Sequence, residues 1–218
     1  MNDLPDGWVD VALPSVVYFQ EGPGLRKWQF GKSGIPFLNI RTFNGGRINR
    51  ESCQFVKMEE FRGSYEHFLL NDGDIVVSSS GTIGKVALIH TADLPLMLNT
   101  STIRFRALYS DVLTQLFLKL FLHSRSFVQQ INSAKTGSAI FNYGPSHLKQ
   151  MSIAIPPIAE QKRVVAKVEA LLADVNAARN RLAKVPALLR RFRQSVLSAA
   201  CREGDHVEVN DILANLKY

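Results

Sequence analysis

The feature that most constrains this chain is a long apolar repeat in its C-terminal part. Apolar residues recur there at alternating steps of four and three, at Val164, Val168, Leu171, Val175, Ala178, Leu182, Val185, Leu189, Phe192 and Val196. A 3.5-residue period kept over several heptads is typical of a coiled coil, in which one helix buries its seam against another. A long amphipathic helix packed on its own domain is the alternative. The strict period and the basic outer face favour the coiled coil.

Pro186 lies inside this repeat. A proline removes one backbone hydrogen bond and kinks or breaks a helix. The sequence fits either two helices, over 158–184 and 187–201, or one bent helix. In either case a lone helix would leave its apolar stripe in water, so the repeat predicts a partner helix.

The first 156 residues have a different pattern. Short apolar runs bounded by Gly, Asn, Asp and Pro predict strands in IPFLNI, GDIVVSS, KVALIH and STIRFRA. Helical spacing in DVLTQLFLKLFLHSRSFVQQI predicts two helices that meet near His123 and Ser124. The segment GPSHLKQMSIAIPP predicts a short helix capped by Ser146 and a last strand. We therefore expect a mixed α/β (α+β) domain over 1–156, coiled-coil helices over 157–203 and a tail over 204–218.

The segment SSSGTIGKV raises the question of a phosphate-binding loop. Gly84 and Lys85 match the end of that motif, but Ser79 stands at the required first glycine and Val86 at the required hydroxyl. The residues after Lys85 are apolar and β-branched, which suits a strand better than a helix. A β-hairpin with a glycine-containing loop is the favoured interpretation.

No catalytic motif stands out in the sequence. HExxH, GxSxG and a GxGxxG after a strand are missing, and the five histidines are scattered. Asp72 and Asp74 predict a turn before a strand rather than a metal site. We expect no catalytic residue and no metal ligand, and hence a chain that is not an enzyme by itself.

Two observations concern the compartment. Cys53 and Cys201 fit neither a zinc site nor a disulfide framework. No apolar run reaches the ~20 residues of a membrane span, and the N-terminus lacks the pattern of a signal peptide. A cytoplasmic protein is the expectation.

The formal net charge is +7, which allows an anionic partner. Most of the excess lies in residues 160–200, where the acidic residues are Glu160, Glu169 and Asp174. The basic residues of that segment are Lys162, Arg163, Lys167, Arg179, Arg181, Lys184, Arg190, Arg191 and Arg193.

Several segments resemble the specificity subunits of type I restriction–modification systems. The similar segments are LPDGWVDVALPSVV, IPFLNIRTFNGGRI, GDIVVSSSGTIGKVALI, AIPPIAEQKRVVAKVEALLADV and VPALLRRFRQSVLSAA. The proline pair that leads through AEQKR into a long heptad helix is the most specific of them. Family members often carry a proline just before the LL-RFRQ-VL run, and Pro186 occupies that position here. The resemblance extends from residue 4 to about residue 203.

The resemblance implies a DNA target-recognition domain followed by a conserved helix. Full-length members have two such units, and this chain has one, so it is a half-subunit that dimerises or the N-terminal half of a longer protein. Each recognition domain reads one half of a split target on double-stranded DNA. Antiparallel helices hold two domains about one turn of DNA, ~34 Å, apart. Methyltransferase subunits carrying S-adenosylmethionine modify an adenine in each half-site, and nuclease subunits can join. The specificity subunit itself has no cofactor and does no chemistry.

On this resemblance, three loops are candidates for DNA contact, each with a plain solvated turn as the alternative. Their residues are Arg41, Thr42, Asn44 and Arg47; Ser79, Ser80, Thr82 and Lys85; and Lys135, Thr136, Ser138, Asn142 and Tyr143. The basic helix suits either the phosphates between half-sites or, as we favour, docking of the methyltransferase subunits. A different class of function stays open, namely a coiled-coil scaffold whose α/β domain binds a protein or a small ligand.

Overall fold

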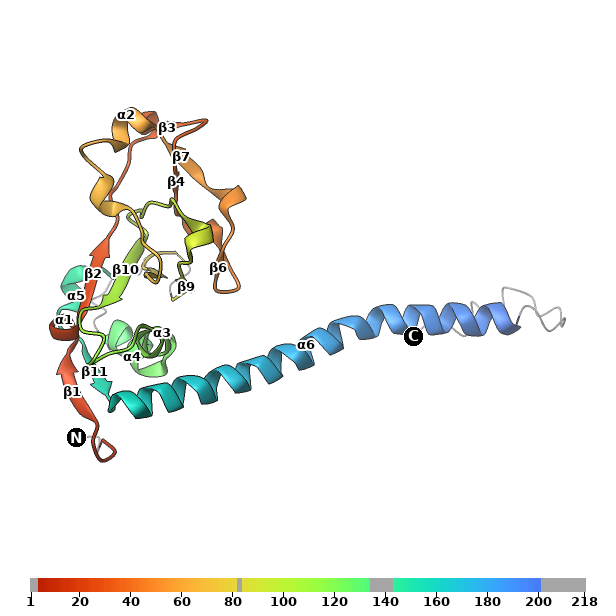
Figure 1. The fold of residues 1–218 in the computed structure, drawn as a ribbon. Helices are drawn as coiled ribbons and strands as arrows, with labels where there is room; N and C mark the ends of the chain where they lie inside the picture. Colours follow the sequence, from red (N-terminus) through yellow and green to blue (C-terminus); the bar gives the residue numbers. More distant parts are fainter. Residues whose placement is uncertain (1–3, 82–83, 134–142, 201–218) are drawn as a thin grey trace. The chain divides into compact units, whose positions relative to one another are not determined.

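A computed structural model describes residues 4–81, 84–133 and 143–200. It divides the chain into two compact units, Met1–Ala166 and Lys167–Tyr218. The expected mixed α/β domain and the expected long C-terminal helix are both confirmed (Figure 1). The boundary between the compact units lies within that helix, about ten residues after the proline pair Pro156-Pro157.

A four-stranded antiparallel sheet forms the centre of the first unit. Its strands, in spatial order, are β2 (Val17–Glu21), β10 (Thr102–Ala107), β8 (Ile75–Ser78) and β9 (Val86–Leu88). Side chains alternate between the two faces of a strand. In β10, Ile103 and Phe105 therefore lie in the main core, while Arg104 and Arg106 lie on the opposite face.

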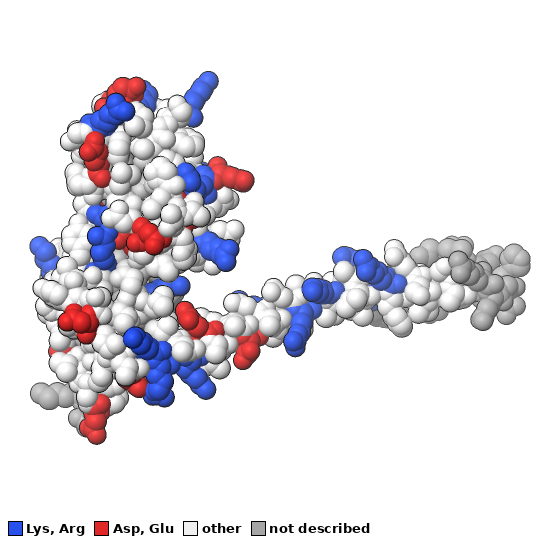
Figure 2. Space-filling view, in the orientation of Figure 1, with Lys and Arg blue, Asp and Glu red and all other residues white. Residues whose placement is uncertain are grey.

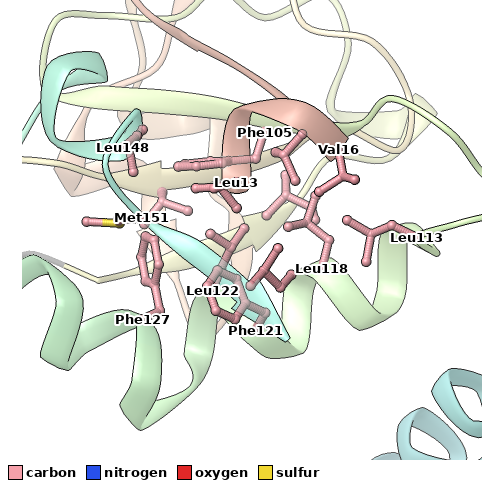
Figure 3. Packing of buried hydrophobic residues seen from close by; sticks show 14 of the residues in the cluster. Leu13, Val16, Phe105, Leu113, Leu118, Phe121, Leu122, Phe127, Leu148 and Met151 are labelled. Atoms are coloured by element: carbon pink, nitrogen blue, oxygen red, sulfur yellow. The ribbon is translucent and has the colours of Figure 1, made fainter. Parts of the chain in front are cut away.

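Two helices, α3 (Gln115–His123) and α4 (Arg125–Ser133), cover the core face of this sheet. They meet at Ser124, as the sequence predicted. Figure 3 shows Phe121 and Phe127 of these helices beside Phe105 of the sheet. The rings of Phe121 and Phe127 lie 5.5 Å apart edge to face, and those of Phe105 and Phe127 lie 6.2 Å apart. Such aromatic pairs add to the stabilisation from apolar burial.

Three smaller sheets complete the first unit. They comprise β1 (Val9–Ala12) with β11 (Ser152–Ile155), then β3 (Phe30–Gly31), β7 (Gln54–Val56) and β4 (Ile35–Phe37), and finally β5 (Phe43–Asn44) with β6 (Arg47–Ile48). Short α-helices are α1 (Leu13–Val16), α2 (Met58–Phe61) and α5 (Pro145–Leu148). Short 3-10 helices are η1 (Lys27–Gln29), η2 (Ile40–Thr42), η3 (Arg50–Ser52), η4 (Glu66–Phe68) and η5 (Thr91–Asp93).

The expected cap of α5 was wrong by two residues. Gly144, not Ser146, is the N-cap, and Pro145 occupies the first helical position. The Gly144 N–H donates to Nδ1 of His147, 3.2 Å away. A proline at the first helical position needs no amide donor, which explains why the helix begins one residue before Ser146.

The C-terminal helix α6 (Ile158–Ala200) is continuous through Pro186. The sequence left one bent helix or two helices open, and the structure has one. At ~1.5 Å per residue α6 is roughly 65 Å long. Because Pro186 has no N–H, the carbonyl of Leu182 lacks its helical hydrogen bond. Leu182 is exposed, so water can hydrate that oxygen instead. No helix in the described ranges is long and apolar enough to cross a membrane.

The first turns of α6 are part of the first unit. The buried Gln161 fixes them, because its Oε1 accepts from the Thr114 N–H at 2.8 Å while its Nε2 donates to the Val112 and Pro156 carbonyls. Val165 is buried in the main core. From Lys167 onward the helix makes no such contacts within the described residues, and nearly all its side chains are exposed.

Candidate nucleic-acid interface

The segment SSSGTIGKV connects two strands that form a β-hairpin, β8 and β9. Strands β8 and β9 pair antiparallel, with Val77 opposite Val86. Ser78 closes the loop, because its Oγ accepts from the Lys85 N–H at 2.9 Å and its carbonyl accepts from the Gly84 N–H at 3.2 Å. Gly81 and Gly84 have φ of 66° and 80°, a conformation that glycine adopts without strain. A hairpin cannot supply the helix N-terminus that a phosphate-binding loop requires, so the favoured interpretation is confirmed.

The second candidate loop lies against this hairpin. Nζ of Lys85 is 3.5 Å from the Ile40 carbonyl oxygen. A Cβ atom at Gly81 would lie 3.1 Å from Cδ1 of Ile40. Asn39 caps η2 by accepting the Arg41 N–H at 2.8 Å, which leaves the Arg41 side chain exposed. Two segments some forty residues apart in sequence thus form one surface.

The NGGR segment is a tight hairpin rather than an open loop. Asn44 of β5 pairs with Arg47 of β6 across Gly45 and Gly46, whose φ angles of 58° and 81° are both positive. Two such glycines are the signature of a two-residue hairpin turn that matches strand twist. Phe43 is buried below it, so Asn44 and Arg47 project into solvent from a fixed base.

A groove of about 450 Å³ lies beside these loops. Its lining residues are Asn39, Ile40, Arg41, Ser52, Gln54 and Ser101. Nδ2 of Asn39 donates to the Ser52 carbonyl at 3.4 Å, which joins two of its walls. In the described part of the chain, neither the Arg41 guanidinium nor the Gln54 amide makes a hydrogen bond, so both can receive a ligand. Arginine and glutamine offer the bidentate geometry that matches guanine and adenine edges.

Three of the predicted contact residues are buried, and for these we correct the prediction. Thr42, Ser79 and Tyr143 have relative exposures of 0%, 0% and 1%. The Thr42 hydroxyl donates to the Asn39 carbonyl at 2.6 Å, and the Tyr143 N–H donates to the Ser79 carbonyl at 3.3 Å. Burial raises the pKa of the Tyr143 hydroxyl. The Thr42 hydroxyl and the Tyr143 hydroxyl, which donates to the Ser78 carbonyl at 3.4 Å, support the loops from beneath. Oγ of Ser79 is buried without a hydrogen-bond partner among the described residues.

The other predicted residues divide into two groups. Exposed or half-buried ones are Arg41, Asn44, Arg47, Ser80 and Lys85. Those outside the described residues are Thr82, Lys135, Thr136, Ser138 and Asn142. Tyr143, at the edge of the third candidate loop, contacts Ser78 and Ser79 at the base of the first. Two of the candidate segments therefore lie together at one end of the central sheet, and Tyr143, the described residue of the third, is bonded to the same end.

Sequence reasoning missed four polar residues of the groove. Ser52 and Ser101 precede strands and Gln54 begins one, and these strands come together only in the folded chain, while Asn39 reads as an ordinary cap. The only sequence signal was their polarity beside strand ends. Among the described residues, no group of three or more His, Cys, Asp or Glu side chains is arranged to hold a metal ion.

The chain thus combines a mixed α/β domain that carries a polar groove with a long helix whose apolar seam is exposed. Residues 5–186 match the family model described as the type I restriction modification DNA specificity domain, and the chain belongs to this family.

The chain is 28% identical over 205 residues to the EcoKI specificity subunit of Escherichia coli K12, covering 90% of this chain and 43% of that protein. It is 27% identical over 202 residues to the StySPI specificity subunit of Salmonella potsdam, again covering 90% and 43%. The crystal structure of the HsdS subunit from Thermoanaerobacter tengcongensis has the same fold, with a TM-score of 0.68 at 22% identity over 91% of this chain and 46% of that one. The chain thus spans less than half the length of these relatives.

Proposed function

We propose that this chain reads one half of a split DNA target for a type I restriction–modification complex. The observation that carries the proposal is a polar groove built from segments distant in sequence, 39–41, 52–54 and Ser101, with Lys85 bonded to Ile40 beside it, in a domain of the specificity family. Arg41 and Gln54 supply base-reading groups at this groove, while Arg47 and Lys85 supply cations for phosphates beside it.

The chain is a non-catalytic subunit in this proposal. Partner methyltransferase subunits hold S-adenosylmethionine and modify adenine, and nuclease subunits join the complex. The chain's own residues position those partners on DNA. The proposal is supported by the family to which the chain belongs.

The second unit supplies the assembly surface. Seam side chains of α6 are 41–68% exposed at Leu171, Val175, Leu182, Val185, Leu189, Phe192 and Val196. Exposure of so many large apolar side chains on one stripe marks a protein interface. We propose that this seam pairs antiparallel with a second copy of the chain, or with an equivalent helix of a longer polypeptide. Figure 2 shows Lys and Arg side chains along the visible face of the helix, where they suit docking of acidic partner surfaces.

Charges beside the seam constrain a pairing of two copies. Arg179 and Arg181 flank the seam between Ala178 and Leu182. A two-fold axis beside residue 180 would bring both arginines against their copies, which costs energy through like-charge repulsion. A register shifted by one heptad places the two-fold axis between residues 183 and 184. This register separates each arginine from its copy and still pairs seam residues, for example Val175 with Phe192. We expect a self-pair to adopt that register.

The first test is the salt dependence of DNA binding. We expect fluorescence anisotropy to show binding of the full chain to a labelled duplex, with an affinity that falls steeply as salt increases. If Arg47 and Lys85 each neutralise one phosphate, the slope of log K against log salt is about −2 or steeper. A scaffold that binds protein or a small ligand would show no binding to duplex DNA at low salt, and that result would refute the proposal.

A second test addresses base reading by Arg41. The target is first identified by sequencing DNA methylated by the assembled complex. We expect Arg41→Ala to weaken binding to that target roughly 10- to 100-fold and to relax specificity at one position. Arg41→Lys keeps the charge but loses the planar fork, so it should lose most of the specific affinity and little of the non-specific affinity.

Arg125→Ala is the matched control, because Arg125 is an exposed arginine on α4, at the opposite face of the central sheet. The affinity of the Arg125→Ala variant for target and random duplexes should equal that of the wild type. Equal losses for Arg41→Ala on both duplexes would reassign Arg41 to a phosphate.

A further inference from the structure

Among the described residues of the first unit, Trp28 is the most exposed large apolar side chain, at 61% of its maximum. The other tryptophan, Trp8, packs against the main core, with its ring 6.2 Å from that of Phe117. An exposed tryptophan carries a cost in water that a partner can relieve, and tryptophan is enriched among the residues that dominate interfaces. Trp28 has no part in the groove described above.

The backbone beneath Trp28 is rigid. Its neighbour Gln29 is only 4% exposed, and Oε1 of Gln29 accepts from the Arg26 N–H at 2.9 Å. Nε2 of Gln29 donates to Oε2 of Glu60 and to the Tyr65 hydroxyl, each at 3.2 Å, while the Gln29 carbonyl accepts from the Lys57 N–H at 3.0 Å. A side chain held on so fixed a base loses little conformational entropy when it binds.

Exposed basic residues lie close to Trp28 in the sequence, and one more lies on the segment that follows the paired strand β7. We call the Trp28 platform the set of exposed residues Arg26, Lys27, Trp28, Lys32 and Lys57. The Lys57 stem lies along Gly31, where a Cβ atom would be 3.1 Å from its Cγ. The helix α2 carries two acidic residues, Glu59 and Glu60. Glu60 accepts a hydrogen bond from Gln29, so Glu59 is the one left to offset the positive charge. Figure 2 shows Lys and Arg side chains together with acidic ones at the end of the domain that carries α2 and β3.

The platform is connected to the groove through one short strand. β7 begins at Gln54 in the groove, and Lys57 of the platform follows its last residue. At ~3.3 Å per residue these positions are about 10 Å apart. Successive base pairs of duplex DNA are ~3.4 Å apart along the helix axis. A duplex seated at the groove with its axis along β7 therefore needs to extend only about three base pairs to reach the platform.

We propose that the Trp28 platform binds the sugar–phosphate backbone of the duplex beside the half-site. The indole N–H donates to a phosphate oxygen, its ring packs on the adjoining deoxyribose, and Lys27, Lys32 and Lys57 neutralise neighbouring phosphates. Backbone contacts fix the register of a protein on DNA without reading sequence, so this contact operates on any duplex. The inference rests on the proposed DNA-binding function.

Intrinsic fluorescence tests this proposal, because the chain has only two tryptophans. In the Trp8→Phe variant of the full chain, all tryptophan emission comes from Trp28. On adding a random 30-base-pair duplex at low salt, we expect its quenching by acrylamide to fall at least twofold. In the Trp28→Phe variant, which reports Trp8, the quenching should stay unchanged. Trp28→Ala should weaken binding to every duplex by roughly tenfold without changing sequence preference.

The outcomes are distinguishable. If anisotropy shows the duplex bound while Trp28 stays fully accessible to acrylamide, the platform proposal fails and the proposed function stands. If the chain binds no duplex at any salt concentration, both fail. Protection of Trp28 by a purified methyltransferase subunit, and not by DNA, would overturn the proposal and reassign the platform to protein docking.

Discussion

Replacing Leu182 and Leu189 by glutamate should convert a self-associating chain into a monomer. Both are seam residues, 68% and 53% exposed on the isolated helix. Burying a leucine contributes about 1.5–3 kcal/mol, and two copies would each lose two such contacts. The loss, about 6 kcal/mol or more, corresponds to an increase of at least 10⁴-fold in the dissociation constant. Light scattering at micromolar concentration should report a dimer for the wild type and a monomer for the variant.

The control places the same charges on the outer face of the helix. Asn180 and Ala187 are also seven residues apart and lie opposite the seam in the heptad. Because glutamate is a good helix former, Asn180→Glu with Ala187→Glu should leave both helicity and dimerisation intact. A wild-type chain that is monomeric alone, but that forms a complex with the seam helix of a longer relative, would favour a fragment of a full-length subunit. Dimerisation that survives both leucine changes would exclude the seam as the interface.

The periodic elements of this fold were predictable from the sequence. The heptad seam, the two helices that meet at Ser124 and the hairpin from β8 to β9 each have a local signal, namely a period or a glycine turn. The continuity of α6 through Pro186 was not decidable, because one missing hydrogen bond on an exposed helix can be offset by hydration.

The groove was only partly predictable, for a physical reason. Arg41 of the groove and Lys85 beside it were found from loop composition, but Gln54 and Ser101 join Arg41 through tertiary contacts that leave no local pattern. Burial was the other source of error. Thr42 and Tyr143 have the chemistry of DNA-contacting residues, yet the fold uses their hydrogen-bonding groups to support the loops. Residue type alone does not distinguish a residue that contacts a ligand from one that holds the contacting loop in place.

The turn at Asn71–Asp74 shows the same limit. The sequence predicted a turn before a strand, and the Asp74 N–H does donate to the Asn71 carbonyl at 3.1 Å. It did not predict that Asp74, with 0% exposure, would pair with two arginines of β10 some thirty residues later. Oδ1 of Asp74 is 2.7 Å from a terminal nitrogen of Arg106, and Oδ2 is 3.6 Å from one of Arg104.

Replacing Asp74 by alanine should destabilise the first unit by about 3–5 kcal/mol, since removal of one partner leaves a buried charge uncompensated. Most of this cost falls on Arg104, whose side chain is 7% exposed, because Arg106 is 43% exposed and can turn to water. The carbonyls of Leu69 and His67 and the Gln20 side chain still accept from Arg104, but none carries a negative charge. Urea unfolding, followed through Trp8 in the Trp28→Phe background, measures the change.

Asp72→Ala is the matched control, since Asp72 lies in the same turn but is exposed and accepts only from the Thr91 hydroxyl at 3.0 Å. It should cost less than about 0.5 kcal/mol, as surface substitutions do. If Asp74→Ala cost no more than Asp72→Ala, the ion pairs would carry no stability and Arg104 would be held by its carbonyl acceptors alone. A loss in the expected range is a large part of the ~5–15 kcal/mol that a folded domain possesses. The loop at the end of β8, which we propose faces DNA, then depends on a charge cluster at the start of the same strand, and Asp74→Ala should weaken the proposed DNA binding through unfolding rather than through any lost contact.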